Sequence, residues 1–358
     1  MEKSIREESE KAIIQRVFPG CVIGVVKTNG ERRILPFGKF TYEKEALEVK
    51  EDTMYDLASL TKSLPTASLA LMLIDQGKLK LTDKLIEYLP EFQNSDRENV
   101  LIKHLLTYTL DGYGLASAVD GSSDQASLHK RSSEDLLRVL YTHDFEKRPG
   151  EAFKYTNIPA ALLGLVVEKI MGATLDALAD EYFFHPLNMT RTTFYPEKFS
   201  KEEIVPTEID DWRGLVHGVV HDESAYICKR DGKIMGHAGV FSAAGDILNF
   251  LEVLLHEGEF NGKKYFSREI VEMMGSNQIP ELDDFTGLGF ELNQPRFMGK
   301  YAGEHTFGKT GFTGTLCVVD VEKEVAYIIL SNRIYPHRPD NSEAINAFRA
   351  KIGEIILA

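Results

Sequence analysis

The sequence predicts an α+β fold in which the two ends of the chain build one antiparallel sheet and the middle is mostly helical. Three observations predict this: β-branched runs near the N-terminus, β-rich runs near the C-terminus, and helical apolar spacing between them. The 358 residues suffice for one large domain or two, and 43% hydrophobic residues is ordinary for a packed globular protein. We expect a discontinuous sheet region, 1–78 and 230–358, and a mostly helical region over 79–229.

The N-terminal part of the chain reads as a helix followed by a hairpin. Residues 2–17 have the polar amphipathic pattern of a surface helix. The β-branched runs 21–27 and 33–37 are strand candidates, and Asn29-Gly30 between them is typical of a tight turn. This pattern predicts two antiparallel strands at the start of the sheet.

A short extended piece at 54–57 leads into Ser59 and then into a helical pattern. Apolar residues recur with helical spacing over 61–76, and Gly77 is a stop signal. Pro65 falls in the first two turns, where proline is tolerated better than further inside a helix. Ser59 is therefore expected where a strand passes into a helix.

The middle of the chain contains helices and loops. The clearest helical patterns are 103–109, 133–142 and 160–171, and the polar stretch 120–133 is a candidate mobile loop. Strand patterns return at 316–321 and 325–330, separated by the turn 322–324. A closing helix is expected over 342–357, so that helices from both termini flank the sheet.

Charge and cysteine content limit the possible functions. A net charge of −14 argues against binding nucleic acid or an anionic membrane, because those partners require clustered Lys and Arg. Cys21, Cys228 and Cys317 lie far apart and are expected to be buried free thiols. No apolar run approaches the roughly 20 residues of a membrane span, and residues 1–20 lack a signal-peptide pattern. We expect a cytoplasmic protein, whose oligomeric state the sequence does not indicate.

Three short motifs occur in a fixed order: Ser59-Leu60-Thr61-Lys62, Tyr155-Thr156-Asn157 and Lys309-Thr310-Gly311. A lone Ser-x-x-Lys arises easily by chance, and this chain has a second one, Ser127 to Lys130, in a polar run with no strand before it. The ordered trio is much rarer. It combines a serine with a nearby amine, a phenol and a cationic strand edge, the parts of a serine acyl-transfer enzyme.

The first motif suits a nucleophile and its base. A serine at the start of a helix lies beside unpaired backbone N–H groups and the positive end of the helix dipole. Lys62, three residues after Ser59, is expected next to its hydroxyl. Burial and a neighbouring cation lower the pKa of a lysine, and a neutral amine can accept the serine proton.

The second motif suits proton relay and substrate contact. Between Lys62 and Lys309 the phenolate of Tyr155 would be favoured, so that the residue could pass a proton to a leaving group. Asn157, two residues on, would point from the same side of an extended backbone and could donate to a substrate carbonyl.

The third motif suits an edge strand that binds substrate. Glycines in Lys309-Thr310-Gly311 and the following residues allow a ligand backbone to approach closely. Lys309 could attract a substrate carboxylate. The backbone N–H groups of Phe312 and Ser59 could form an oxyanion hole, in which one donor is typically worth about 2.7–4 kcal/mol of barrier.

With these motifs the chain resembles the penicillin-recognising serine hydrolases: class C β-lactamases, D,D-carboxypeptidases and related esterases. The resemblance runs from about residue 15 to the C-terminus. It extends to four further stretches, 100–109, 149–157, 185–192 and 308–315. It implies a β-lactamase-like fold that needs no cofactor or metal.

The resemblance also implies a role for each motif residue. Ser59 would be the nucleophile, Lys62 its proton acceptor, Tyr155 the acid and base, and Lys309 a substrate-binding or electrostatic group. Tyr-Thr-Asn in the second motif is closer to the class C and esterase branch than to class A, so deacylation would also fall to Tyr155. The expected substrate is a small ester, β-lactam or D-amino-acid peptide, with Lys309 suiting one that carries a carboxylate.

Two alternatives remain open at the level of sequence. His217 and His221, four residues apart with Asp222 and Glu223 following, could hold a metal for hydrolysis, although Gly218 argues against the helix such a site uses. A structural or pocket-lining role also suits these histidines and His237. The second alternative is a penicillin-binding sensor that keeps the fold but has little turnover.

Overall fold

The computed structural model describes residues 1–93, 96–112 and 130–358. Its centre is a six-stranded antiparallel sheet in the order β2-β1-β12-β11-β10-β9. The strands are β1 (Gly20–Lys27), β2 (Arg32–Gly38), β9 (Glu291–Leu292), β10 (Phe307–Thr310), β11 (Leu316–Asp320) and β12 (Val325–Ser331). Because β1 pairs directly with β12, the two ends of the chain share one sheet, and the α+β fold class is confirmed.

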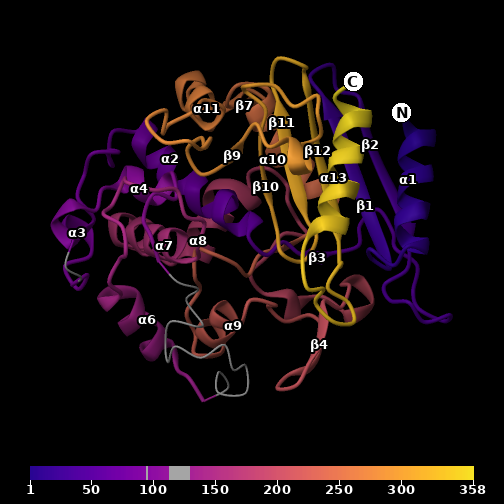
Figure 1. The fold of residues 1–358 in the computed structure, drawn as a ribbon, viewed down its shortest axis with the longest axis horizontal. Helices are drawn as coiled ribbons and strands as arrows, with labels where there is room; N and C mark the ends of the chain where they lie inside the picture. The colour runs from indigo at the N-terminus through magenta and orange to yellow at the C-terminus, as the bar shows by residue number, and fades with distance from the viewer. Residues whose placement is uncertain (94–95, 113–129) are drawn as a thin grey trace.

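Alternate side chains of β1 enter two different cores, as the two-residue period of a strand requires. Cys21, Ile23 and Val25 pack in a cluster with residues of α1 (Glu2–Ile14) and α13 (Glu343–Ile356). Val22 and Val26 belong to the larger cluster on the opposite face, which includes α2 (Ser68–Asp75) and α10 (Ala244–Leu255). Figure 1 shows α1 and α13 along the sheet near the two chain termini. The terminal helices therefore cover one face of the sheet, as expected.

Helices and short hairpins make up the remaining described part of the chain. The further α-helices are α3 (Leu85–Tyr88), α4 (Ile102–Leu106), α6 (Ser133–Thr142), α7 (Ile158–Met171), α8 (Leu175–Ala179), α9 (Glu223–Arg230), α11 (Arg268–Met274) and α12 (Pro295–Met298). Short 3₁₀ and π segments are η1 (Lys62–Ala67), η2 (Arg97–Asn99), η4 (Asp180–Phe184), η5 (Pro196–Lys198) and η6 (Lys201–Glu203). Two-stranded pairs are β3 (Tyr55–Asp56) with β6 (Phe241–Ser242), β4 (Glu208–Asp210) with β5 (Gly214–Val216), and β7 (Glu259–Phe260) with β8 (Lys263–Lys264).

The helix expected over 61–76 is interrupted. Leu64 has φ −117° and ψ 112°, and this break lies within η1, which precedes α2. A proline clashes with a helical residue before it and lacks an N–H, so Pro65 breaks the helix where we expected it to be accommodated. Most of the polar stretch 120–133, and Ser127 of the second Ser-x-x-Lys, lie outside the described residues.

The three cysteines, Cys21, Cys228 and Cys317, are buried free thiols, as predicted. Within the described ranges no single helix is long and apolar enough to span a membrane. The bent pair Ile158–Met171 and Leu175–Phe184, at 79° to one another, reaches that length and apolarity only when taken together.

Candidate active site

Ser59 lies in a tight turn between β3 and η1. The buried carboxylate of Asp56 accepts a hydrogen bond from the Ala58 N–H at 2.8 Å and another from the His221 N–H at 2.8 Å. Ala58 has φ +48°, a left-handed conformation that is strained for a residue with a Cβ. The chain therefore holds the residue before Ser59 in an unfavourable conformation by hydrogen bonds to a neighbouring acid.

The segment that follows the Lys309-Thr310-Gly311 motif is hydrogen-bonded to the turn that precedes Ser59. Thr313 Oγ1 donates to the carbonyl of Asp56 at 2.7 Å, and Thr315 Oγ1 donates to that of Leu57 at 3.0 Å. At Gly311 a Cβ would collide with the Thr315 hydroxyl and the Leu57 carbonyl. Glycine is therefore required at this position for the two segments to meet, although they lie more than 250 residues apart in the sequence.

The Lys62 amine lies 2.9 Å from Ser59 Oγ and also donates to the backbone carbonyl of His237 at 2.9 Å. The side chain is almost fully buried. Burial lowers the pKa of Lys62 to about 7; the negative charge of Asp222 opposes this shift, and the positive charge of Lys309 adds to it. Near neutral pH a large share of this amine is therefore neutral and able to accept the serine proton.

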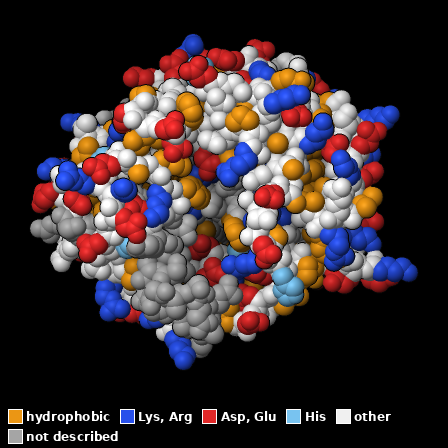
Figure 2. Space-filling view, in the orientation of Figure 1, with side chains coloured by type: hydrophobic (Ala, Val, Ile, Leu, Met, Phe, Trp, Pro, Cys, Tyr) orange, Lys and Arg blue, Asp and Glu red, His pale blue; other side chains and the backbone are white. Residues whose placement is uncertain are grey.

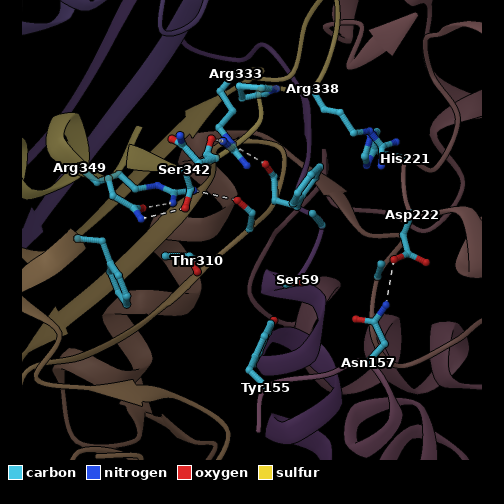
Figure 3. Close-up of a pocket in the computed structure, with 18 of the residues that line it drawn as sticks. Ser59, Tyr155, Asn157, His221, Asp222, Thr310, Arg333, Arg338, Ser342 and Arg349 are labelled. Carbon is cyan, nitrogen blue, oxygen red and sulfur yellow. Dashed lines mark hydrogen bonds between the residues drawn. The ribbon is translucent and has the colours of Figure 1, made fainter. Parts of the chain in front are cut away.

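Tyr155 faces the same serine. Its hydroxyl points towards Ser59 in Figure 3, and the Lys62 amine lies 5.4 Å from the centre of its ring. Desolvation of the phenol raises the pKa of Tyr155 above its ordinary value, although the residue is 39% exposed at the cavity. The nearby Lys309 opposes this rise, and Tyr108 and Glu291 add to it. This direction is opposite to the expectation that two lysines favour the phenolate, and it favours the neutral phenol of Tyr155.

Lys309 is fully buried and paired with an acid. Its amine lies 3.1 Å from Glu291 Oε1 and 4.0 and 4.2 Å from the ring centres of Tyr155 and Tyr108. It is absent from the described residues that line the cavity in front of Ser59. Of the two roles considered for Lys309, this position favours the electrostatic one over direct attraction of a substrate carboxylate.

The cavity itself has a volume of about 480 Å³. Ser59, Tyr155, Asn157, Thr310, Gly311 and Phe312 all line it. Figure 2 shows a hollow near the middle of this face, where the helical region meets the sheet. The predicted residues of all three motifs, apart from the buried Lys62 and Lys309, therefore share one accessible cavity.

Two backbone N–H groups at this cavity are available to bind a substrate oxygen. Within the described part of the chain, the N–H groups of Ser59 and Phe312 make no hydrogen bond. Both residues line the cavity. This pair matches the oxyanion hole expected from the sequence.

Arginines gather at one end of the cavity. Arg333 donates to the Phe312 carbonyl at 2.9 Å and to that of Asn341 at 3.1 Å. Arg349 donates from Nη2 to the Gly311 carbonyl and from Nη1 to the Asn346 side chain. Burial lowers the pKa of both, that of Arg349 to about 9 with a contribution from Arg333. Neither guanidinium forms an ion pair with another described residue.

The histidines singled out in the sequence have separate partners. His217 Nε2 bonds to backbone carbonyls of Lys201 and Ile204, whereas the His221 ring bonds to the Glu208 carboxylate at 2.9 Å. His221 also stacks on the Phe312 ring, with centroids 5.6 Å apart. His237 is fully buried and bonds to Asp222. Across the described residues, no group of three or more His, Cys, Asp or Glu side chains could hold a metal ion.

Sequence reasoning missed several charged residues of this site: Asp56, Asp222 as a cavity residue, Glu291, Arg333 and Arg349. The sequence pattern indicates Asp222 only as a possible metal ligand beside His221. No sequence motif marks Glu291. It lies opposite Gly308 only because the two-residue strand β9 pairs with β10, and so short a strand has no recognisable pattern. Arg333 follows β12 in a loop, and only its buried position without an acidic partner marks it.

Comparison with known proteins supports a single relationship over almost the whole chain. The sequence profile of the Beta-lactamase family matches residues 2–351. A protein of Escherichia coli (strain K12) is 29% identical over 339 residues, covering 88% of this chain and 76% of its own length. One from Escherichia coli O157:H7 is 30% identical over 330 residues, covering 86% and 74%. Both are described as "Putative D-alanyl-D-alanine carboxypeptidase".

Solved structures have the same fold. The hydrolase EstCE1, described as having promiscuous acyltransferase activity, superimposes with a TM-score of 0.76 at 20% identity, covering 100% of this chain and 98% of its own. The octameric penicillin-binding protein homologue from Pyrococcus abyssi gives a TM-score of 0.74 at 23% identity, covering 99% and 77%. These likenesses establish the β-lactamase-like architecture.

Proposed function

The chain belongs to the β-lactamase family of serine hydrolases, and we propose that it cleaves a small, carboxylate-bearing amide or ester through an acyl-enzyme on Ser59. The observation that carries this proposal is the 2.9 Å contact between Ser59 Oγ and the buried Lys62 amine beside an accessible cavity. A nucleophile with its base in hydrogen-bond reach, facing a space for substrate, is the arrangement that covalent catalysis needs.

The first half-reaction uses the buried amine of Lys62 and the cavity-facing phenol of Tyr155. Neutral Lys62 takes the proton of Ser59 as its oxygen attacks the substrate carbonyl, and the N–H groups of Ser59 and Phe312 stabilise the resulting oxyanion. Tyr155, a neutral phenol beside Ser59, gives its proton to the leaving group and regains one from the Lys62 ammonium. An acyl group then remains on Ser59.

The second half-reaction reverses these transfers with water. After acylation Lys62 is again a neutral amine, so it can accept the proton of the attacking water, directly or with the Tyr155 phenol passing its own proton on to Lys62 and taking the one from water. That proton then returns to Ser59 Oγ as the acyl group leaves as a carboxylic acid. Lys309 serves here as a fixed positive charge next to the Tyr155 ring, and its partner Glu291 limits how far that charge lowers the phenol's pKa.

The arginine end favours a substrate carboxylate. Arg333 and Arg349 are buried cations without acidic partners, which is costly unless an anion compensates them. Arg338, by contrast, already pairs with Glu208 and Glu223 at 2.6 and 2.8 Å. We assign the carboxylate contact to Arg333, whose Nη2 has no hydrogen-bond partner within the described ranges. A peptide ending in a free carboxylate, the substrate named for the relatives, is the preferred candidate.

Rates on matched substrates test this assignment. A peptide ending in D-alanyl-D-alanine, its C-terminal amide, a short-chain ester and a penicillin would be compared. We expect the free peptide to be cleaved faster than its amide, and Arg333→Met to remove most of that difference, with the exposed Arg268→Met as control. Equal rates on acid and amide in the wild-type protein would contradict the carboxylate contact. The cytoplasmic location expected from the sequence stays a prediction, which cell fractionation checks.

A further inference from the structure

The side of the cavity opposite Arg333 and Arg349 carries a carboxylate. Figure 3 shows Asp222 and Asn157 on one side of Ser59, and Arg333 and Arg349 on the other. The Asp222 side chain is 24% exposed and lines the cavity. The nucleophile therefore lies between the Asp222 carboxylate on one side and the Arg333 and Arg349 guanidinium groups on the other.

The two oxygens of Asp222 have different surroundings. Oδ1 accepts hydrogen bonds from Ser224 Oγ at 2.6 Å, the Ala225 N–H at 2.9 Å and His237 Nε2 at 3.0 Å. Oδ2 accepts only from Asn157 Nδ2, at 3.1 Å, among the described residues. Burial opposes ionisation, but His237 and Ser224 hold the pKa of Asp222 well below its usual range. Asp222 is therefore an acceptor with spare capacity on Oδ2.

This carboxylate fixes the orientation of Asn157. An ionised carboxylate can only accept, so the amide nitrogen of Asn157 must face Asp222 and its carbonyl oxygen must face the other way. In Figure 3 that oxygen points towards Ser59 and Tyr155. We expected Asn157 to donate to a substrate carbonyl, but its amide nitrogen already donates to Asp222, and its carbonyl oxygen is the group turned towards Ser59. Asp222 and Asn157 therefore both present an acceptor to the cavity.

The surroundings suit a polar group better than an alkyl chain. The described cavity wall here includes the polar side chains of His221 and Glu223 and the small Ala238, and its apolar surface comes from the Phe312 ring, which stacks on His221. An alkyl chain placed here would remove water from the Asp222 carboxylate without replacing its hydrogen bonds, which is unfavourable. A hydroxyl or N–H group would satisfy both acceptors.

We propose that Asp222 and Asn157 recognise a hydrogen-bond donor, a hydroxyl or an N–H, on the side of the scissile carbonyl opposite the group held by Arg333. This inference rests on the proposed function and narrows its substrate class. The preferred substrate is polar on both sides of the bond that is cleaved: a carboxylate on the leaving group and a donor-bearing acyl group. Plain alkanoyl esters are then poor substrates.

Esters that differ in one hydrogen-bond donor test the proposal. The 2-hydroxypropanoyl and 2-methoxypropanoyl esters of 3-hydroxybenzoic acid have the same carboxylate-bearing leaving group and similar inductive effects, but only the first can donate. We expect kcat/KM to favour the hydroxy ester by about tenfold or more, since only this ester replaces the hydrogen bonds that these acceptors lose when water leaves the cavity. Equal values for the two esters would overturn the proposal.

Substitutions at Asp222 and Asn157 test whether these two residues cause the preference for the hydroxy ester. Asp222→Asn keeps a residue that can cap α9 but replaces an ionised acceptor, so the ratio of the two kcat/KM values should fall towards one. Asn157→Ala should lower the same ratio, and it remains informative if Asp222→Asn does not fold. Asp340→Asn, at the arginine end, should leave the ratio unchanged. A wild-type ratio retained in both Asp222→Asn and Asn157→Ala would overturn the assignment.

The design separates this inference from the proposed function. Turnover of both esters that is lost in Ser59→Ala supports the hydrolase whatever the ratio. If both esters are hydrolysed equally fast by a Ser59-dependent route, only the donor recognition is wrong. If neither ester nor any member of the substrate panel is turned over, the proposed hydrolase function itself is contradicted.

Discussion

The ammonium of Lys309 lies 3.1 Å from the carboxylate of Glu291, inside a cage completed by the rings of Tyr108 and Tyr155. This ion pair determines which of Lys62, Tyr155 and Lys309 can accept or donate a proton. The positive charge of Lys309 is balanced by Glu291, and Tyr155 keeps its phenol proton. Lys62 is the base, because burial lowers its pKa to about 7. Each role leads to a measurable consequence.

The acid limb of the pH–rate profile should report Lys62. Only its neutral amine accepts the Ser59 proton, so kcat/KM should fall as pH drops through about 7. A steady-state profile from pH 5 to 9 measures this limb. A profile that is flat across neutral pH would remove Lys62 as the base.

Glu291→Gln should move that limb. The negative charge of Glu291 raises the pKa values of both Lys62 and Tyr155, so its removal should shift the acid limb to lower pH. Glu269→Gln, at an exposed position on α11, is the control and should leave the profile in place. No displacement in Glu291→Gln would refute the electrostatic coupling.

Tyr155→Phe should lower kcat by roughly 10²–10⁴, the usual loss when a general acid is removed. The ring of Tyr155 lies tilted against that of Tyr108, with centroids 5.1 Å apart, and contacts Lys309. Phenylalanine keeps those contacts, so the thermal midpoint should change little. Stopped-flow or steady-state assays alongside thermal melts measure both quantities. Unaltered kinetics would exclude Tyr155 from proton transfer.

Lys62→Met should change how stability depends on pH. The wild-type amine has a pKa of about 7 in the folded state against 10.5 for an ordinary lysine, so the unfolded chain binds the extra proton between these values. Wild-type stability therefore falls as pH drops from 10.5 to about 7, whereas this contribution is absent in Lys62→Met. Urea unfolding at pH 7 and pH 9.5 should give a larger stability gain of the variant at pH 7. A gain that is equal at both values would show that the amine is not perturbed.

The fold was largely predictable because local patterns determine it. The β-branched run at 21–27 and the β-rich run at 325–330 became the paired strands β1 and β12, and the helix at 133–142 was predicted with its observed bounds. The helix after Ser59 was not, because Pro65 interrupts it at Leu64. The division at residues 79 and 230 stays a prediction.

The site was predictable only as far as its motifs extend. Ser59 and Lys62 are three residues apart, and their contact follows from local geometry. The partners of Lys309 and Asn157 do not: Glu291 meets Lys309 through a two-residue strand, and Asp222 reaches Asn157 from a loop 65 residues away. Both contacts alter the roles expected from the sequence. Glu291 balances the charge of Lys309, and Asp222 turns the carbonyl oxygen of Asn157, rather than its amide nitrogen, towards Ser59.

The most direct test is to identify the residue that becomes acylated. The protein would be treated with a fluorophosphonate and, separately, with a labelled penicillin, followed by intact-mass measurement and peptide mapping. We predict a single adduct on Ser59 that is lost in Ser59→Ala and retained in Ser127→Ala, the other Ser-x-x-Lys serine. Labelling that persists in Ser59→Ala, or no labelling of the wild-type protein by either reagent, would contradict the assignment of Ser59 as the nucleophile.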